Sequence, residues 1–184
     1  MTERFRNRYR VPSTRLQTWD YATHAAYFIT ICTAGHEPYF GEIIHQIMKL
    51  STLGKIVESE WLKTPDLRPD MNLILDNFVV MSDHFHAIII IGQNEYNRDG
   101  DINPNPGGIF GPQRKNLGSI IRGFKSAVTT YARKNNIIFG WQERFYDRII
   151  RNDREFIRIS HYIETNPENW MDGHDPHLKT NHDE

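Results

Sequence analysis

Two histidines separated by one residue are the first candidates for chemistry in this 184-residue chain. His84 and His86 lie in FVVMSDHFHAIIII (Phe78–Ile91), an apolar run interrupted only by the two rings and by Ser82-Asp83. Side chains alternate along a strand, so the imidazoles would share one face, with Cα atoms roughly 6–7 Å apart. Rings at that spacing can bind one metal ion. For an H-x-H pattern alone, two hydrogen-bonded structural histidines are the simpler explanation.

The residues after the histidines favour the metal site. Ile88 and Ile90 lie on the same face of the strand as the two rings. The residues on the opposite face, Phe85, Ala87 and Ile89, are also apolar. Both faces of the strand are therefore hydrophobic, as in a central strand that is covered on both sides. Two imidazoles at the beginning of such a strand indicate a binding site.

A second pair of candidates lies near the end of the chain, in EFIRISHYIETNPENW. Tyr162 and Asn166 are one helical turn apart, so they point the same way from a helix whose apolar stripe includes Ile159 and Ile163. The amide oxygen of Asn166 could complete a metal site. A tyrosine hydroxyl beside a divalent ion can attack a phosphate and form an aryl phosphate that can be attacked again. For Tyr162 alone, a surface tyrosine on an amphipathic helix is the simpler explanation.

The elements that must position these residues follow from hydrophobic periodicity and turn chemistry. Strands are predicted at 26–33, 71–81, 84–91 and 144–150, and helices at 51–63, 117–135 and 153–165. Ser51 and Asn152 are the expected N-caps, with Glu155 nearly completing a capping box, and Asn166-Pro167 is expected to end the last helix. A short strand is possible at 43–44, and 92–116 is a long polar connection that is functional or disordered.

This order predicts an α+β protein with a ferredoxin-like βαββαβ arrangement, in which helices pack on one face of an antiparallel sheet. An additional C-terminal helix, which carries Tyr162, is free to cross the sheet and approach the histidine strand. We expect one catalytic domain at 23–170, a basic N-terminal arm at 1–22 and a polar tail at 171–184.

The net charge neither supports nor excludes a nucleic-acid partner, because 22 basic residues nearly balance 23 acidic ones. The basic residues are clustered, however, in the arm and in 112–134, which contains no acidic residue. Such local patches favour binding to a polyanion, although a solvated helix face explains any single cluster equally well. The predicted nucleic-acid-binding residues are Arg6, Arg8, Arg10, Arg114, Lys115, Arg122, Lys125 and Arg133.

The single Cys32 excludes an internal disulfide and is predicted to be a buried thiol. No apolar run has the length of a membrane span, and no apolar segment follows the arginine-rich N-terminus as in a signal peptide. A soluble cytoplasmic protein with no membrane partner is expected.

The combination of these motifs resembles the single-tyrosine HUH transposases, in particular the branch of REP-associated tyrosine transposases. The specific part is an H-x-H after a valine-methionine turn together with the late Tyr-Ile-x-x-Asn-Pro. The resemblance covers most of the chain, including AYFITICTAGHEPYFGEI, KLSTLGKIVESEW, LILDNFVVMSDHFHAIIII, RGFKSAVTTYARK and WQERFYDRIIRNDREFIRISHYIETNP.

The resemblance implies a metal-dependent DNA transposase that cleaves and rejoins single-stranded DNA at hairpin-containing ends. His84, His86 and Asn166 would ligate Mg²⁺ or Mn²⁺. Tyr162 would be the nucleophile that forms a 5′-phosphotyrosine link and frees a 3′-hydroxyl. Members of this family work as monomers or homodimers. The family usually has Pro-Asn before the first histidine, whereas this chain has Ser82-Asp83, and Asp83 adds a negative charge near the metal.

Other residues and functions compete with this interpretation. Tyr131 completes the apolar stripe of its helix and is predicted to be core, Tyr146 is also predicted to pack, and His161 is predicted to be exposed. Two other functional classes stay open. One is a DNA-binding protein of the same fold that has lost activity, which Asp83 makes plausible. The other is a hydrolytic metal enzyme in which Tyr162 takes no part.

Overall fold

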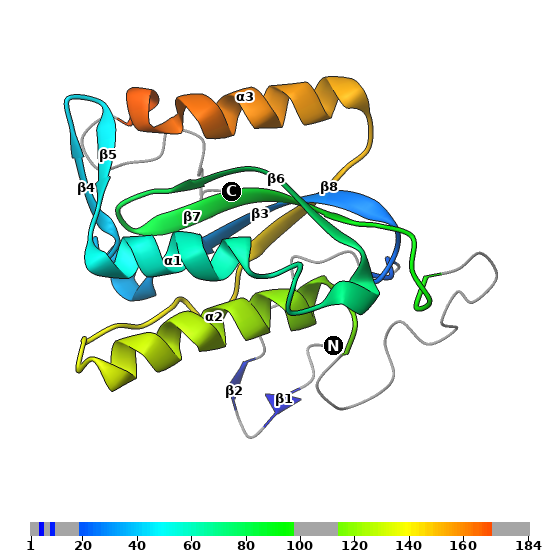
Figure 1. Ribbon diagram of the computed structural model, residues 1–184, viewed down its shortest axis with the longest axis horizontal. Coiled ribbons are helices and arrows are strands. Elements are labelled where there is room, and N and C mark those ends of the chain that lie inside the picture. The colour runs from blue at the N-terminus through cyan, green and yellow to red at the C-terminus, as the bar shows by residue number, and fades with distance from the viewer. Residues whose placement is uncertain (1–3, 6–7, 10–18, 98–113, 171–184) are drawn as a thin grey trace.

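The fold consists of a four-stranded antiparallel sheet covered by helices on both faces (Figure 1). The computed structural model describes residues 4–5, 8–9, 19–97 and 114–170, with side chains from Trp19 onward. The strand order in the sheet is β6-β7-β3-β8. The strands are β3 (Ala25–Cys32), β6 (Leu73–Val80), β7 (His84–Ile91) and β8 (Tyr146–Ile150). The helices are α1 (Thr52–Leu62), α2 (Leu117–Lys134) and α3 (Asp153–Asn169).

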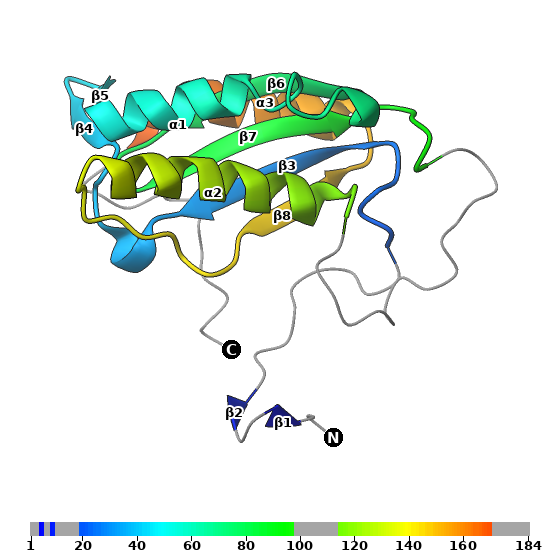
Figure 2. The ribbon, with the colours of Figure 1, turned by 60° about the horizontal axis from the view of Figure 1, so that its bottom comes forward.

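The three layers confirm the predicted α+β class and the separate role of the last helix. Helices α1 and α2 lie side by side across one face of the sheet, and α3 lies behind the other face (Figure 2). The histidine strand β7 is central, with β3 and β6 as its antiparallel neighbours. Its predicted bounds, 84–91, are those observed. Among the described residues, no helix is both long and apolar enough to cross a membrane.

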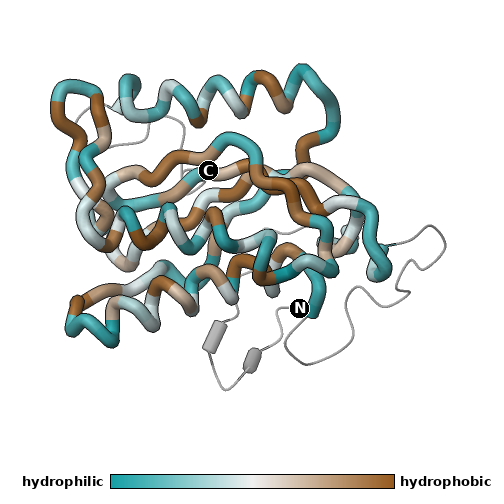
Figure 3. The backbone as a smooth tube through the Cα atoms, in the orientation of Figure 1, coloured by the Kyte–Doolittle hydropathy of each residue, from teal (hydrophilic) through white to brown (hydrophobic). Residues whose placement is uncertain are grey.

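The face under α1 and α2 holds the larger core. The rings of Trp61, Phe85 and Phe124 lie with centroids 5.0–5.5 Å apart, at distances typical of packed aromatic side chains. Each fully buried side chain of this size contributes about 1.5–3 kcal/mol through the hydrophobic effect. Figure 3 shows hydrophobic residues concentrated in the strands and recurring at intervals along the helices.

The face under α3 holds a second, smaller cluster. Its buried members are Phe28, Ile88, Ile150, Ile159 and Ile163. Ile159 and Ile163 belong to the predicted stripe of the last helix, which confirms the face that α3 turns to the sheet. This cluster fixes α3 against β3, β7 and β8.

The predicted helix starts are correct. The hydroxyl of Ser51 accepts a hydrogen bond from the Gly54 amide at 3.1 Å, and the Asn152 side chain accepts one from the Glu155 amide at 2.9 Å. The box at Asn152 is incomplete, because the Glu155 carboxylate accepts from the Arg151 amide instead. Substitution of a cap by alanine typically costs about 1 kcal/mol.

The connection before α1 differs from the prediction. The possible strand at 43–44 is one arm of a hairpin formed by β4 (Gly41–Ile44) and β5 (Ile47–Leu50). The two turn residues, His45 and Gln46, have φ of 50° and 64°, which is the pattern of a type I′ turn. Glycine and asparagine usually mark such a turn, so His-Gln gives no sequence signal for it. This hairpin contacts α3 and rises beside its C-terminal end (Figure 1).

The predicted end of the last helix is also wrong. Helix α3 includes Pro167 and continues to Asn169. Proline removes one backbone hydrogen bond, but this loss falls in the final turn. There the Asn169 side chain donates to the Thr165 carbonyl at 3.0 Å and supports the turn.

Short elements complete the described chain. Turns of 3₁₀ helix, η1 (Ala34–His36) and η2 (Pro69–Met71), follow β3 and precede β6. Within the predicted N-terminal arm, β1 (Arg4–Phe5) pairs with β2 (Arg8–Tyr9). The rest of residues 1–18 and the predicted tail 171–184 lie outside the described residues.

Candidate active site

The two histidine rings lie together on the α3 side of β7, as their spacing predicted. Their centroids are 4.5 Å apart with an interplanar angle of 67°, and both residues are at most 1% exposed. Phe85, between them, points to the opposite face and packs on Trp61. Burying two imidazoles in an apolar sandwich is unfavourable unless each ring has polar partners.

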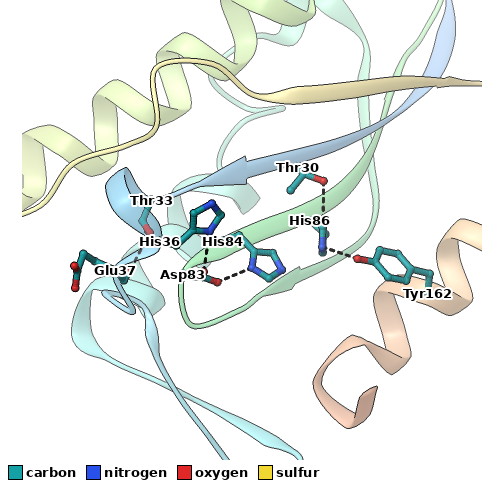
Figure 4. A network of polar contacts seen from close by, with 8 residues as sticks. All are labelled: Thr30, Thr33, His36, Glu37, Asp83, His84, His86 and Tyr162. Atoms are coloured by element: carbon teal, nitrogen blue, oxygen red, sulfur yellow. Dashed lines mark hydrogen bonds and ion pairs between the residues drawn. The ribbon is translucent and has the colours of Figure 1, made fainter. Parts of the chain in front are cut away.

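Tyr162 reaches the histidines from α3. Its hydroxyl oxygen lies 3.0 Å from Nε2 of His86, although the residues are 76 positions apart in sequence (Figure 4). The Tyr162 ring also meets the edge of Phe28, with centroids 6.1 Å apart. The predicted meeting of a late tyrosine with the mid-chain histidines therefore occurs within one chain.

The other ring nitrogen of His86 is bonded across the sheet. Nδ1 lies 2.8 Å from the hydroxyl of Thr30, which is 2% exposed and directly opposite His86 in the pairing of β3 with β7. When Nδ1 carries the proton and donates to Thr30, Nε2 presents a lone pair that accepts from the Tyr162 hydroxyl. One lone pair serves either that hydroxyl or a metal ion.

His84 has a different partner, the carboxylate of Asp83. Nδ1 of His84 lies 2.7 Å from Oδ1, and Nδ1 of His36 lies 3.0 Å from Oδ2 (Figure 4). Burial alone would raise the pKa of the Asp83 carboxyl, but its interactions with the rings of His84 and His36 outweigh burial and lower the pKa. The sequence predicted only that Asp83 adds a negative charge near the metal. It did not predict the two ring contacts of Asp83 or the parts played by Thr30 and His36.

Asn166 is buried near the C-terminal end of α3, the helix that carries Tyr162. It is 4% exposed, and neither its Oδ1 nor Nε2 of His84 has a hydrogen-bond partner among the described residues. The ring of Trp170 lies 5.2 Å from that of His84, so the end of α3 covers the first histidine. Unsatisfied buried lone pairs on an imidazole and an amide are suited to a cation.

The donor set fits a divalent metal if Asn166 takes part. Imidazole nitrogen and amide oxygen are both used by divalent first-row ions. In the described part of the chain, no three His, Cys, Asp or Glu side chains are grouped so that they could hold a metal. Among the described residues, a metal site built on the two histidines would therefore need the predicted third ligand, Asn166.

Those of the predicted nucleic-acid-binding residues that the structure describes do not lie around the histidines and Tyr162. The side chains of Arg6, Arg8 and Arg10 lie outside the described residues. Arg114, Arg122 and Arg133 are exposed, on or just before α2, which covers the opposite face of the sheet from Tyr162.

The two predicted lysines have partners within the protein. Lys115 is paired with Asp70 and lies over the Tyr96 ring. The ammonium of Lys125 donates to the carbonyl of Gln142 at 2.6 Å, and burial lowers the pKa of Lys125 to about 8. On the side of α3, exposed arginines that sequence analysis did not single out are Arg151, Arg154 and Arg158.

Three of the remaining predictions from the sequence are confirmed, and the one for Tyr146 is wrong. Tyr131 packs against the large core, Cys32 is a buried free thiol, and His161 is exposed, as predicted. Tyr146 is not well packed. It is 44% exposed, on the same face as His86, and meets the Phe28 ring at 6.3 Å. Tyr146 is thus a second tyrosine close to the histidines.

Comparisons with known proteins support the fold and identify a relative. No protein-family model matches the chain. A solved structure of a REP-associated tyrosine transposase bound to a REP hairpin has a TM-score of 0.58 and 18% sequence identity, over 88% of this chain and 76% of that one. At this identity the similarity shows a common fold. A putative transposase from Deinococcus radiodurans is more distant, with a TM-score of 0.37 and 14% identity over 84% of this chain and 96% of that one, too low to inform the fold.

A curated relative is much more similar in sequence. It is a protein of Haemophilus influenzae, described as an uncharacterized protein, that is 39% identical over 163 residues. The match spans 86% of this chain and 88% of the relative. The chain therefore belongs to the same family as this Haemophilus influenzae protein, and it has the fold of the REP-associated tyrosine transposase.

Proposed function

We propose that this protein is a metal-dependent DNA transposase and endonuclease, which cleaves and rejoins single-stranded DNA through a 5′-phosphotyrosine intermediate on Tyr162. The observation that carries the proposal is the 3.0 Å contact between the Tyr162 hydroxyl and Nε2 of His86, beside the ring of His84. A surface tyrosine on an amphipathic helix is not expected to contact a buried pair of histidines.

The reaction needs a nucleophile that stores the energy of the cleaved bond. The Tyr162 oxygen attacks the scissile phosphorus, a new oxygen–phosphorus bond forms, and the bond from phosphorus to the 3′ oxygen breaks. The departing 3′ oxygen takes up one proton, which balances the proton lost by the phenol. The aryl phosphate keeps the bond energy, so a 3′-hydroxyl can reverse the step and rejoin DNA.

The residues around Tyr162 position it for this step. The edge of Phe28 contacts the phenol ring, and the stripe of Ile159 and Ile163 fixes α3 on the sheet. His84, His86 and Asn166 would hold Mg²⁺ or Mn²⁺. When bound, such an ion neutralises charge on the non-bridging oxygens of the phosphate. Because Tyr162 and the histidines meet within one chain, a monomer would contain a complete site, and a homodimer would not need to exchange helices.

The fold and the exposed charges support a nucleic-acid partner. The solved structure with this fold contains a REP hairpin, and the chain carries exposed arginines on α2 and α3. We propose single-stranded or hairpin DNA from repeats as the substrate. Exposed cationic side chains would contact its phosphates without reading sequence.

A covalent-adduct assay tests the proposal. Oligonucleotides from repeats flanking the gene, labelled at the 3′ end, are incubated with protein and Mn²⁺ or Mg²⁺ and resolved on a denaturing gel. A labelled protein band that disappears with chelator is the expected result. Tyr162→Phe should abolish it, whereas the matched control Tyr146→Phe should keep it, since Tyr146 is a second tyrosine on this face.

The outcomes separate the alternatives. Cleavage without any adduct, unchanged in Tyr162→Phe, would indicate the hydrolytic metal enzyme. Hairpin binding with neither cleavage nor adduct would indicate a DNA-binding protein that has lost activity. An adduct that persists in Tyr162→Phe and disappears in Tyr146→Phe would move the nucleophile to β8.

A further inference from the structure

We infer that Asp83, held in turn by His36, is the positioning residue that fixes the ring of His84 so that Nε2 carries the lone pair facing the site. The proposed function supplies the use of that lone pair, whereas its geometry follows from the contacts below. From the sequence, Asp83 is a departure that makes a loss of activity plausible, whereas the contacts of its carboxylate indicate a supporting role.

A buried carboxylate must be fully paired, and Asp83 is. It is 7% exposed, and each of its oxygens faces one imidazole, Oδ1 at 2.7 Å from Nδ1 of His84 and Oδ2 at 3.0 Å from Nδ1 of His36. An ionised carboxylate only accepts hydrogen bonds, so both Nδ1 atoms must carry protons. Charge-assisted bonds of this kind are short and strong.

The backbone holds the carboxylate in place. The Asp83 carbonyl accepts from the Thr33 amide at 2.8 Å, the Ser82 carbonyl from the Phe40 amide at 2.9 Å, and the His84 carbonyl from the Met81 amide at 2.8 Å. The first two bonds tie the turn between β6 and β7 to the segment after β3, which also carries His36, and the third closes the turn. Asp83 therefore approaches His84 from a rigid position.

The consequence for His84 is a single tautomer. With the proton on Nδ1, Nε2 has a free lone pair, and this atom is buried without a partner among the described residues. A carboxylate on the far nitrogen makes an imidazole a stronger electron-pair donor and fixes its orientation. The other histidine is held less strictly, because the Thr30 hydroxyl that contacts His86 can either donate or accept.

His36 completes the arrangement from the surface. Its side chain is 55% exposed and its backbone adopts a left-handed φ of 56°. The ring therefore reaches a buried carboxylate from an exposed turn. By pairing with Oδ2, it keeps the second oxygen of Asp83 from turning towards His84 or the site.

The test reads the tautomer directly, in the full-length protein without added metal. Proton–nitrogen correlation NMR of the imidazole rings, assigned with His84→Gln, should find Nδ1 protonated and Nε2 unprotonated in His84. Asp83→Ala should move His84 towards the other tautomer, because no acceptor remains for Nδ1. An unchanged His84 tautomer in Asp83→Ala would overturn the inference.

Mn²⁺ titration gives a second readout. Asp83→Ala should weaken binding about 10–100-fold, the usual effect of removing a partner of a metal-ligating histidine. The isosteric Asp83→Asn should weaken it less, about tenfold, because an amide oxygen is neutral and serves one ring. Glu37→Gln is the matched control: it removes one negative charge from an exposed neighbouring carboxylate and should change nothing.

These arms separate the inference from the proposed function. If the parent protein binds Mn²⁺ and neither Asp83 variant loses affinity, or if Glu37→Gln loses as much, Asp83 does not position His84. If the parent protein has the expected tautomer and Asp83→Ala changes it, but no DNA adduct forms, the inference holds and the proposed reaction fails. Asp83→Asn keeps the test available if Asp83→Ala does not fold.

Discussion

The two faces of the sheet are built from the same strands and bury different kinds of side chain. Under α1 and α2 the large core is mainly aromatic and aliphatic, with Phe85 against Trp61 and Phe124. Under α3 the apolar cluster is small, and Thr30, His84 and His86 are buried beside it.

The difference indicates that one face of the sheet mainly stabilises the fold and the other holds the candidate site. Buried polar groups contribute little to stability even when they are paired, because they lose their hydration. The large aromatic core supplies the stability that allows a polar site on the other face. Alternation along β7 connects the two, since neighbouring residues of one strand serve opposite faces.

Substitutions at adjacent positions of β7 give the strongest test of this division. His86→Ala should lower adduct formation about a thousandfold, equivalent to several kcal/mol of transition-state stabilisation, with the fold retained. Phe85→Ala should lower the free energy of unfolding by about 3–5 kcal/mol because it opens a cavity. Adduct assays and urea denaturation measure both. A loss of activity in His86→Ala that came only from unfolding would contradict the division.

A matched pair of isoleucines asks the same question of the helices. Ile159→Ala on α3 and Ile121→Ala on α2 should each lower the free energy of unfolding by about 2–5 kcal/mol. Ile159→Ala should also slow adduct formation in the folded protein, since Ile159 holds the helix that positions Tyr162. Ile121→Ala should not. Equal activities of the two folded variants would mean that α3 packing does not position the nucleophile.

The meeting of Tyr162 with the two histidines could be predicted from the sequence because it follows from local patterns. The parity of His84 and His86 and the helical spacing of Tyr162 and Asn166 are short-range features, and the element order placed one helix across the sheet. The network of Thr30, His36 and Asp83 depends on which residues meet in register between strands and turns.

The other differences have local physical causes. The type I′ turn at His45-Gln46 lacks the residues that favour left-handed backbone, so the β4–β5 hairpin could not be found. Pro167 suggested the end of a helix that continues to Asn169. The basic residues of α2 were recognised as a cluster, but the sequence does not state which face of the sheet that helix covers.

Lys125 is a half-buried charge on α2, and its pKa gives a pH test. Burial lowers this pKa to about 8, against about 10.4 in an unfolded chain. Between these values the unfolded state binds more protons, so the free energy of unfolding should rise as pH increases from about 8 to about 10.4. Below about pH 8 the cost of burying the charge is fully present.

Lys125→Met should remove that rise, by at most about 1 kcal/mol once solvent screening of this half-buried group is considered. Urea denaturation at several pH values, with the exposed Lys134→Met as control, measures it. Identical slopes for Lys125→Met and the parent protein would mean that the ammonium is not buried in solution.

The arginines of α2 provide the smallest expected effects. Arg122→Gln and Arg133→Gln should each weaken binding to single-stranded DNA uniformly across sequences and reduce the slope of log affinity against log salt by about 0.7 per lost phosphate contact. Lys125→Gln should have less effect, because the Gln142 carbonyl already accepts from its ammonium. Equal losses for Arg154→Gln and Arg158→Gln on α3 would place DNA over both faces. Losses confined to α3 would exclude α2 from the DNA interface.

The proposed reaction attaches Tyr162 covalently to the 5′ phosphate of cleaved DNA. Digestion of the adduct with protease and nuclease, followed by mass spectrometry, locates the attached nucleotide. We expect a nucleotide mass on the peptide that contains Tyr162 and none on the peptide that contains Tyr146. A nucleotide on any other residue, or cleaved DNA with a free 5′ phosphate and no modified peptide, would contradict it.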